Sequence, residues 1–329
     1  MINAELKLSE KILTEEIEKE PTRDGFGKGL VIIGEENHNV VVLSADVAAS
    51  TRCHWFAEKF PERFFQVGIS EQNLAVVAAG FGVSGKIPFM SAYAAFSPGR
   101  NWEQIRTTIA YNDSNVKIAG HHAGLLTGHD GATHQILEDI ALMRAMPNMK
   151  VIVPCDAVEA KKATIAAAKI SGPVYIRLAR EKTAVMTTEE TPFVPAKAEI
   201  FWESKKPQVL IIGCGPILYN ALLAAEELEK EKIGTIVLNN HTIKPIDENK
   251  IIELAKKCGA VVSVEEHNIF GGLGSAVSEV LAKNFPTPME FIGTKDVFGE
   301  SGNPEELIEK YGLGVKDIKE AVKKVIKKK

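Results

Sequence analysis

The sequence predicts an α/β protein made of two doubly wound domains, each with a mostly parallel sheet. The chain has 329 residues, which is long for one ordinary domain and sufficient for two cores. Short apolar, β-branched runs alternate with helical patterns, and such alternation favours a parallel sheet covered by helices. The alternation stops at residues 187–195, which are rich in Thr, Glu and Pro, and then begins again. We therefore expect one domain on each side of this stretch.

The first domain is predicted to span residues 22–186, after an N-terminal extension of residues 1–21. Residues 74–84 are rich in Ala, Gly and Val, so we expect them to form a closely packed helix. The predicted strands of this domain are the short apolar runs 40–44, 64–67, 116–119, 151–153 and 174–178.

The second domain is predicted to span residues 205–329, after a linker of residues 187–204. Gly213-Cys214-Gly215 lies between a predicted strand and a predicted helix. Leu218 stands where a dinucleotide-binding motif has its third glycine, so we interpret this segment as a tight turn. The predicted strands are residues 209–212, 235–238, 260–264 and 291–292, and the predicted helices are residues 219–231, 248–258 and 275–284.

The sequence GGLG at residues 271–274 opens a predicted helix and has two interpretations. Its backbone N–H groups are suited to holding a phosphate. Alternatively, its glycines allow close packing at the start of the helix.

Composition excludes several function classes. The net charge of −4 gives no bulk attraction to nucleic acid or to anionic membranes. No apolar run approaches the length of a membrane span, and the first 21 residues lack the apolar segment of a secretory signal, so a cytoplasmic location is expected. The cysteines are widely spaced and are expected to be buried, reduced thiols: Cys53, Cys155, Cys214 and Cys258.

The strongest chemical signal is the loop of residues 120–135, GHHAGLLTGHDGATHQ, which follows a predicted strand. It holds four of the eight histidines in the chain, together with Asp130. Ligands of open α/β sheets bind at the carboxyl ends of strands, where this loop must lie. Histidines titrate near neutral pH and can therefore pass protons. A metal site is the rival interpretation, but no HExxH or comparable spacing is present, so we assign no metal ligands.

Two further segments carry side chains suited to a site. Glu71 follows a predicted strand and a glycine turn and enters an apolar helix, where it could be an ordinary first-turn acid stabilised by the helix dipole. Tyr93 and Phe96 lie three residues apart after a strand. They are either core residues or the walls of a site for a flat heteroaromatic ring.

Together, these segments resemble the C-terminal half of transketolase, from about Arg23 to the end of the chain. This resemblance implies a pyrimidine-binding domain followed by a transketolase C-terminal domain, and it implies the cofactor thiamine diphosphate. The matching motifs are GISEQN at residues 68–73, Tyr93 with Phe96, DGATHQ at residues 130–135, and EEH at residues 265–267 followed by GGLG.

The resemblance also implies a role for each matching residue. The carboxyl of Glu71 is expected to be buried and to hydrogen-bond the aminopyrimidine ring of the cofactor. Two arginines suit the substrate phosphate because guanidinium donors are charged and forked. The implied catalytic residues are Glu71, His122 and His134; the implied cofactor-binding residues are Glu71, Tyr93, Phe96 and Asp46; and the implied substrate-binding residues are Arg23, Ser50, His122, Asp130 and Arg180.

The sequence departs from the family pattern in three places. A third aromatic residue is missing from residues 97–102, where Arg100 or Trp102 is the candidate substitute. His129 replaces the Glu that commonly precedes the DG pair, and Ala132 replaces the Pro of DGPTHQ. These last two changes leave the acceptor preference open.

The GDG motif, which in the family binds the diphosphate through a divalent metal, is not found in this sequence. The resemblance therefore implies a partner, an N-terminal transketolase subunit that carries this motif and binds most of the Mg²⁺ (or Ca²⁺). A heterotetramer is expected by family analogy. The implied function is that of the C-terminal subunit of a split transketolase, active only with this partner. Such an enzyme transfers a two-carbon ketol unit between sugar phosphates of the pentose phosphate pathway, with no nucleic-acid or membrane partner.

Three alternatives remain. The beta chain of a 2-oxoacid dehydrogenase has the same two domains, but the DGATHQ loop and the two arginines suit a sugar phosphate better. A 1-deoxyxylulose-5-phosphate synthase-like enzyme shares several motifs, but it is normally one longer chain. A non-catalytic subunit is disfavoured because Glu71, Asp130, His134 and Arg180 are all present.

Overall fold

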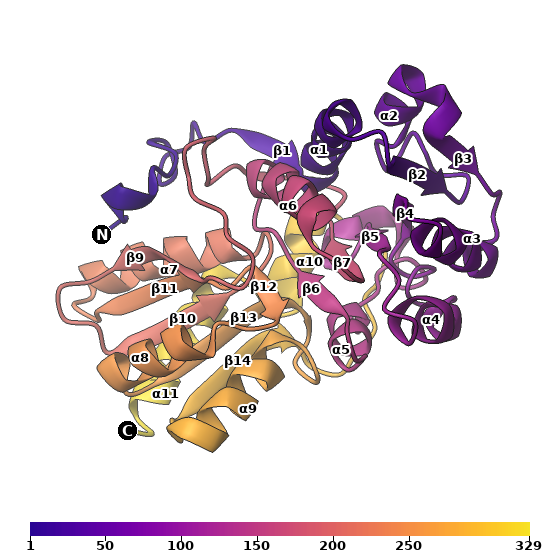
Figure 1. Cartoon of the computed structure of the whole chain (residues 1–329). Helices are drawn as coiled ribbons and strands as arrows, with labels where there is room; N and C mark the ends of the chain where they lie inside the picture. Colours follow the sequence, from indigo (N-terminus) through magenta and orange to yellow (C-terminus); the bar gives the residue numbers. More distant parts are fainter.

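The computed structural model describes all 329 residues and places them in two α/β domains side by side (Figure 1). One sheet has seven strands in the order β12-β6-β7-β5-β4-β2-β3, and the other has five in the order β14-β13-β10-β11-β9. Every neighbouring pair is parallel except β12 with β6 and β11 with β9. The prediction of two mostly parallel, doubly wound sheets is confirmed.

The predicted strands are present, with ends that differ by a few residues. The seven-stranded sheet contains β2 (Val40–Ser44), β3 (Phe64–Gln66), β4 (Ile87–Tyr93), β5 (Lys117–His121), β6 (Lys150–Ile152), β7 (Val174–Arg177) and β12 (Thr242–Lys244). The five-stranded sheet contains β9 (Glu199–Glu203), β10 (Val209–Gly213), β11 (Thr235–Asn239), β13 (Val261–Asn268) and β14 (Met289–Thr294). A separate antiparallel pair joins β1 (Lys19–Pro21) to β8 (Lys182–Ala184).

Helices cover both faces of each sheet. On the first sheet, α1 (Thr22–Glu36), α2 (His54–Lys59) and α6 (Ala157–Lys169) pack on one face. The other face is covered by α3 (Glu71–Val83), α5 (Asp139–Arg144) and the segment formed by α4 (Trp102–Gln104) and a π-helix at Ile105–Ala110. On the second sheet, α8 (Glu248–Cys258) and α9 (Leu273–Asn284) oppose α7 (Leu218–Lys230), α10 (Pro304–Lys310) and α11 (Val315–Ile326).

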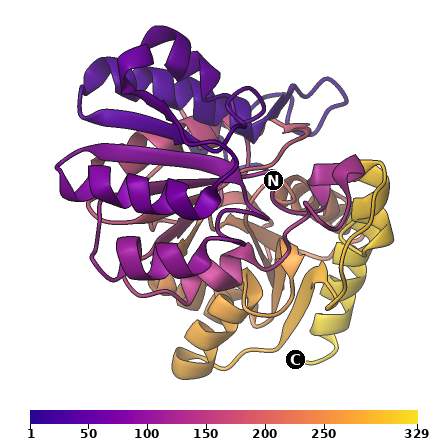
Figure 2. The ribbon, with the colours of Figure 1, turned by 90° about the vertical axis from the view of Figure 1, so that its right-hand side faces the viewer.

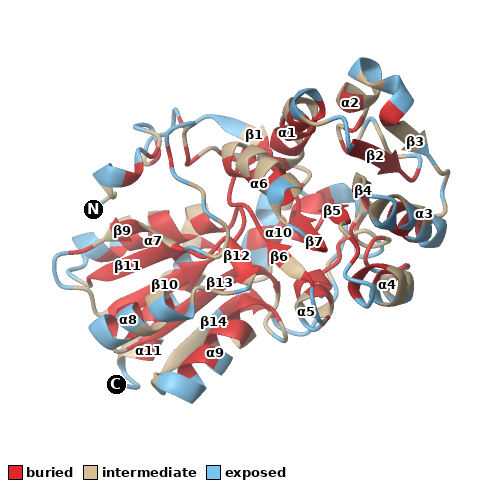
Figure 3. Cartoon of the chain, in the orientation of Figure 1, coloured by how far each residue is buried: buried red, intermediate tan, exposed pale blue.

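One apolar core continues from the first domain into the second. It includes Leu74 and Met90 of the first domain and Leu210 and Leu254 of the second. Figure 3 shows the strands of both sheets as mostly buried, with the exposed residues on the outer helices and loops. Because the two domains bury apolar surface in one cluster, they support each other.

Besides β4 and the pair β1 and β8, two short edge strands of the large sheets are absent from the predicted strands. Residues 199–203 of the expected linker form β9, an edge strand of the second sheet. β12 follows β11 in the chain but pairs with β6 of the first sheet. Both are short edge strands that run antiparallel to their neighbours, so neither shows the long apolar run that marks a buried parallel strand.

The N-terminal segment packs against the second domain. Ile2 bridges to Trp202 of β9, and Leu8 and Ile12 lie in the core cluster that contains helix α7. Figure 2, turned by 90°, shows the 3-10 turn η4 (Leu125–Asp130), in magenta, lying against the yellow α10.

Three further features concern the cysteines, the turn after β10 and the character of the helices. All four cysteines are free and buried, as predicted. Gly215 has a φ of +70°, which fits the expected tight turn between β10 and α7. No helix has the length and apolar character needed to cross a membrane.

The start of α9 resolves the two interpretations of GGLG. The Glu265 carboxylate accepts hydrogen bonds from the backbone N–H groups of Leu273 and Gly274 at 2.7 and 2.8 Å. A carboxylate of the chain itself thus takes the place that a phosphate would need. The phosphate interpretation is therefore wrong.

Candidate active site

The candidate site lies where β2, β4 and β5 end. Ser44 of β2 is level with Ser91 of β4, and Tyr93 of β4 is level with His121 of β5. Tyr93 is therefore the last residue of its strand rather than a loop residue after it. Since the three strands are parallel, the segments that follow them emerge at the same edge of the sheet, where α/β proteins bind ligands.

Glu71 is the first residue of α3 and is only 3% exposed. Its Oε2 atom accepts a hydrogen bond from Nη1 of Arg100 at 2.8 Å. The buried Asn101 donates from Nδ2 to the backbone carbonyl of Glu71 at 2.8 Å and to the Ser97 hydroxyl at 3.1 Å. The carboxyl is thus held in place through both its side chain and its backbone.

Four rings form an aromatic wall beside this carboxyl. The Tyr93 and Phe96 rings are stacked with centroids 6.4 Å apart, and His134 meets the Phe96 ring edge-on at 5.3 Å. His122 stacks on Tyr93 at 4.0 Å. The Tyr93 hydroxyl donates to Oγ of Ser50 at 2.9 Å, which fixes the ring. Tyr93 and Phe96 are therefore walls of the site and not only core residues.

His122 is a neutral imidazole in this environment. It is 2% exposed, and its Nδ1 atom has no hydrogen-bond partner. Burial, and after it the nearby Arg23 and Arg180 guanidinium groups, lower the pKa of His122 to about 3. A neutral ring with a free nitrogen can accept or donate one hydrogen bond to a ligand.

Arginines line the other end of the site. Arg23 donates from Nη1 to the Ser50 backbone carbonyl at 2.9 Å. Burial lowers the pKa of Arg23, as does the nearby Arg52, which pairs with Asp24 at 2.6 Å. The sequence analysis did not identify Arg52, although its position two residues after Ser50 was an available signal.

Asp130 and Arg180, predicted as separate substrate-binding residues, contact each other. Nη1 of Arg180 lies 2.9 Å from Oδ1 of Asp130, and it also donates to the Thr127 backbone carbonyl at 2.9 Å. Thr127 in turn donates from its hydroxyl to the His122 backbone carbonyl at 2.5 Å. Arg180 is thereby tied to the histidine end of the site.

The Asp46 side chain takes part in none of these contacts. The residue is exposed at the end of β2 with a φ of +61°, and its backbone N–H donates to Oε1 of Gln66 at 2.7 Å. Its carboxylate makes no direct contact with Glu71 or the aromatic wall. Asp46 therefore lies on the rim.

The structure also decides between the two candidates for the missing third aromatic. The Trp102 indole donates to the Leu142 backbone carbonyl at 3.2 Å, so it is directed toward α5. The Arg100 guanidinium lies over the Phe96 ring, 4.8 Å from its centroid. Of the two candidates, Arg100 is therefore the one that contacts the aromatic wall.

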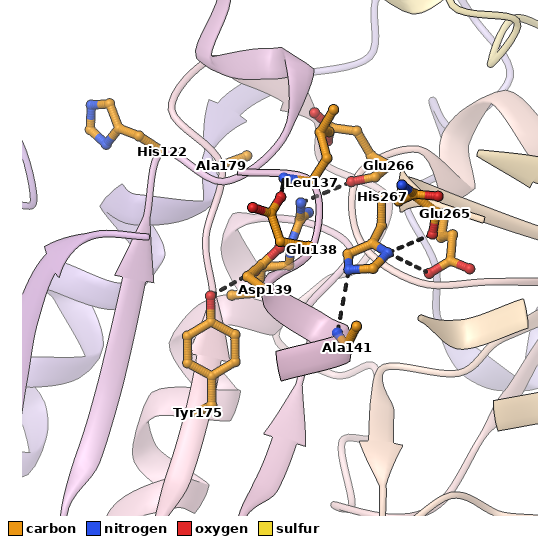
Figure 4. A network of polar contacts seen from close by, with 12 residues as sticks. His122, Leu137, Glu138, Asp139, Ala141, Tyr175, Ala179, Glu265, Glu266 and His267 are labelled. Atoms are coloured by element: carbon orange, nitrogen blue, oxygen red, sulfur yellow. Dashed lines mark hydrogen bonds and ion pairs between the residues drawn. The ribbon is translucent and has the colours of Figure 1, made fainter. Parts of the chain in front are cut away.

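A buried polar network contacts the loop of residues 122–130 through the backbone of Leu126 (Figure 4). Arg177 donates from Nε to Asp139 at 2.9 Å and from Nη2 to the Glu266 backbone carbonyl at 2.8 Å. The Tyr175 hydroxyl donates to the same Asp139 carboxylate at 2.7 Å. Oε1 of Glu266 accepts from the backbone N–H of Leu126 at 2.7 Å. The network thus joins β7 and α5 of the first domain to β13 of the second.

The Glu266 carboxyl of this network is buried at the contact between the domains. Burial raises the pKa of Glu266 to about 7, although the neighbouring Arg177 opposes the shift. Its Oε2 atom has no hydrogen-bond partner. The sequence analysis singled out Glu266 by family likeness but missed Asp139, Tyr175 and Arg177, which lie in ordinary helix and strand patterns.

No group of three or more His, Cys, Asp or Glu side chains is placed to hold an ion. What the site does present is a buried carboxyl, an aromatic wall, a neutral histidine and a cationic end, all in one run of contacts.

Two family models match most of the chain. The family model for the transketolase pyrimidine binding domain matches residues 18–185, and the model for the transketolase C-terminal domain matches residues 196–318. A solved chain described as a split-gene transketolase, inactive β4 tetramer, is 47% identical with a TM-score of 0.87, and the match covers 93% of this chain and 98% of that one.

Curated relatives include proteins of similar length. A protein of Methanocaldococcus jannaschii described as a transketolase C-terminal section is 43% identical over 309 residues, covering 93% of this chain and 96% of the relative. A 6-deoxy-6-sulfo-D-fructose transketolase subunit of Clostridium sp. is 38% identical over 313 residues, covering 95% and 97%. The chain spans about half the length of the mammalian transketolases that it matches.

Proposed function

Because the chain belongs to the transketolase family, we propose that it is the C-terminal subunit of a split transketolase. It would transfer a two-carbon ketol unit from a ketose phosphate to an aldose phosphate. The observation that carries this proposal is the single run of contacts from the buried Glu71 carboxyl, along the aromatic wall, to Arg23 and Arg180.

The site fits the aminopyrimidine end of thiamine diphosphate. That cofactor supplies the electron sink that stabilises a two-carbon carbanion. Glu71 offers a buried acceptor and Phe96 offers an aromatic face, and the planar Arg100 guanidinium contacts both groups. Glu71 would hold a proton at a ring nitrogen, and Tyr93 and His134 would exclude water from that ring.

The sugar end of the site is assigned to the histidines and arginines. His122 is neutral at physiological pH, so it can accept a hydrogen bond from a substrate hydroxyl without adding charge. Arg23, Arg180 and the Ser50 hydroxyl would bind the terminal phosphate, for which forked, charged donors are suited. Asp130 orients Arg180 and is placed to accept from a second hydroxyl.

The diphosphate and its metal are assigned to a partner chain. The similar-length relatives, a transketolase C-terminal section and a split-gene transketolase, support this assignment. We propose an N-terminal subunit that carries the GDG motif and binds Mg²⁺ or Ca²⁺, in a heterotetramer with two copies of each chain. Native mass spectrometry of the co-expressed pair would give this stoichiometry directly.

The test is reconstitution with the product of a neighbouring gene that carries GDG. Ketol transfer between a ketose phosphate and an aldose phosphate is measured with thiamine diphosphate and Mg²⁺ present. Because the Clostridium relative acts on a sulfonated sugar, 6-deoxy-6-sulfo-D-fructose is tested as a donor in the same assay. Decarboxylation of a 2-oxoacid without any ketol transfer would overturn the proposal.

Glu71→Gln is the first variant to measure in that assay. The amide keeps the shape of the side chain but cannot exchange a proton, so turnover should fall by at least about 100-fold, the usual contribution of a positioned acid or base. Assembly with the partner should be unchanged. Glu103→Gln, on the nearby exposed surface of α4, is the matched control. Near-wild-type turnover of Glu71→Gln would remove Glu71 from the mechanism.

A further inference from the structure

Arg100 makes two contacts that a cofactor ring would need. Its guanidinium donates to the carboxylate of Glu71 at 2.8 Å and lies over the Phe96 ring at 4.8 Å. A guanidinium is planar and delocalised, stacks on aromatic faces, and donates N–H groups in its own plane. An aminopyrimidine shares these properties. Arg100 therefore gives Glu71 a hydrogen-bond donor and gives Phe96 a planar group to stack on, as the cofactor ring would.

We propose that Arg100 is a placeholder for the cofactor. It occupies the aminopyrimidine position in the cofactor-free chain, and it leaves this position when thiamine diphosphate binds. This inference rests on the proposed function, since it takes Glu71 and Phe96 as the pyrimidine site. It adds that a residue of the chain itself covers this position until the cofactor binds.

The exposure of the two partners shows which one is able to move. The Arg100 side chain is 50% exposed, whereas the Glu71 side chain is 4% exposed. The guanidinium makes no hydrogen bond other than the one to Glu71. Glu71 keeps its position without Arg100 because Asn101 holds its backbone carbonyl. Arg100 can thus withdraw into solvent while the carboxyl stays in place.

The placeholder also explains how a buried carboxylate is tolerated before the cofactor arrives. An ionised carboxyl without a partner is costly to bury, and a guanidinium at hydrogen-bond distance offsets part of that cost. The same contact must be broken on binding, so it weakens the apparent affinity for the cofactor. If Arg100 fills the site nine-tenths of the time, the apparent Kd is roughly tenfold higher than the intrinsic one.

The test is equilibrium binding of thiamine diphosphate with Mg²⁺ to the complex of the full chain with its partner subunit. Isothermal titration calorimetry is carried out on the wild type, Arg100→Met and Arg106→Met. Methionine keeps an unbranched apolar stem but removes the charge and the donors. Arg106 is an exposed arginine of the π-helix and serves as the matched control.

The expected result is about tenfold tighter binding for Arg100→Met, about 1.4 kcal/mol, and no change for Arg106→Met. Arg100→Lys keeps the charge but cannot stack as a plane, so it should fall between the wild type and Arg100→Met. An unchanged or weaker affinity of Arg100→Met, beside a wild type that binds, would overturn the placeholder alone. Failure of both complexes to bind the cofactor would overturn the proposed function as well.

Thermal melting gives a second readout that a merely structural role would not produce. Without cofactor, Arg100→Met should melt below the wild type because Glu71 loses its cation. With saturating thiamine diphosphate, the two should melt together, since Arg100 has already left the site. An equal loss of melting temperature in both states would show that Arg100 stays on Glu71 and would overturn the proposal.

Discussion

Replacement of Glu266 by Gln should make the chain more stable at alkaline pH and leave its stability almost unchanged in acid. Glu266 is fully buried at the contact between the domains, and burial raises its pKa from the ordinary 4.5 to about 7. Its Oε1 atom accepts from Leu126, whereas its Oε2 atom has no partner. Gln keeps the acceptor and resembles the protonated acid, so the substitution removes only the titration.

The sign follows from the direction of the shift. Below pH 4.5, Glu266 is protonated in both the folded and the unfolded chain and costs nothing. Between pH 4.5 and about 7 the folded chain binds more protons, so stability falls as the pH rises. Above pH 7 this loss of stability is complete. The pKa difference corresponds to about 3 kcal/mol in the free energy of unfolding. Glu266→Gln should recover about 2–3 kcal/mol of this at pH 8.

The assay is urea unfolding of the wild type and the variant at pH 5 and pH 8. Glu159, another buried carboxyl whose pKa burial raises to about 7, should leave a residual pH dependence in Glu266→Gln. The exposed Glu103→Gln is the control for loss of one negative charge. If Glu266→Gln is no more stable than the wild type at pH 8, burial is not what governs this carboxyl.

Two further variants test the network and the cationic end of the site. Arg177→Met leaves the fully buried Asp139 carboxylate without its cation, so the free energy of unfolding should fall by about 3–5 kcal/mol. Urea denaturation measures this change. A loss below about 1 kcal/mol would show that the ion pair does not stabilise the fold. Arg180→Met should raise KM for a sugar phosphate by roughly tenfold or more while kcat stays near the wild-type value, since a phosphate contact serves ground and transition states alike. An equal fall in kcat, seen in steady-state kinetics against the Arg106→Met control, would assign Arg180 to the chemical step instead.

Most of the site could be predicted from the sequence because its residues come in short motifs at strand ends. Glu71, Tyr93 and His122 lie at or just after the ends of strands that meet at one edge of the sheet, as the alternation of strand and helix implies. Asp46 follows the same rule, and yet it lies on the rim. Position at a strand end therefore predicts the edge of the sheet on which a side chain lies, but not its partners.

The sequence by itself determined the α/β class and the order of the main strands and helices, and it supplied the candidate site residues. These are consequences of local periodicity and of motifs only a few residues long. Only the tertiary structure decided that Arg100 rather than Trp102 closes the site, and that β12 crosses to the first sheet. The physical reason is that hydrogen bonds and stacking depend on which groups meet in space. Segments far apart in the chain, such as Leu126 and Glu266, meet only after both sheets have formed.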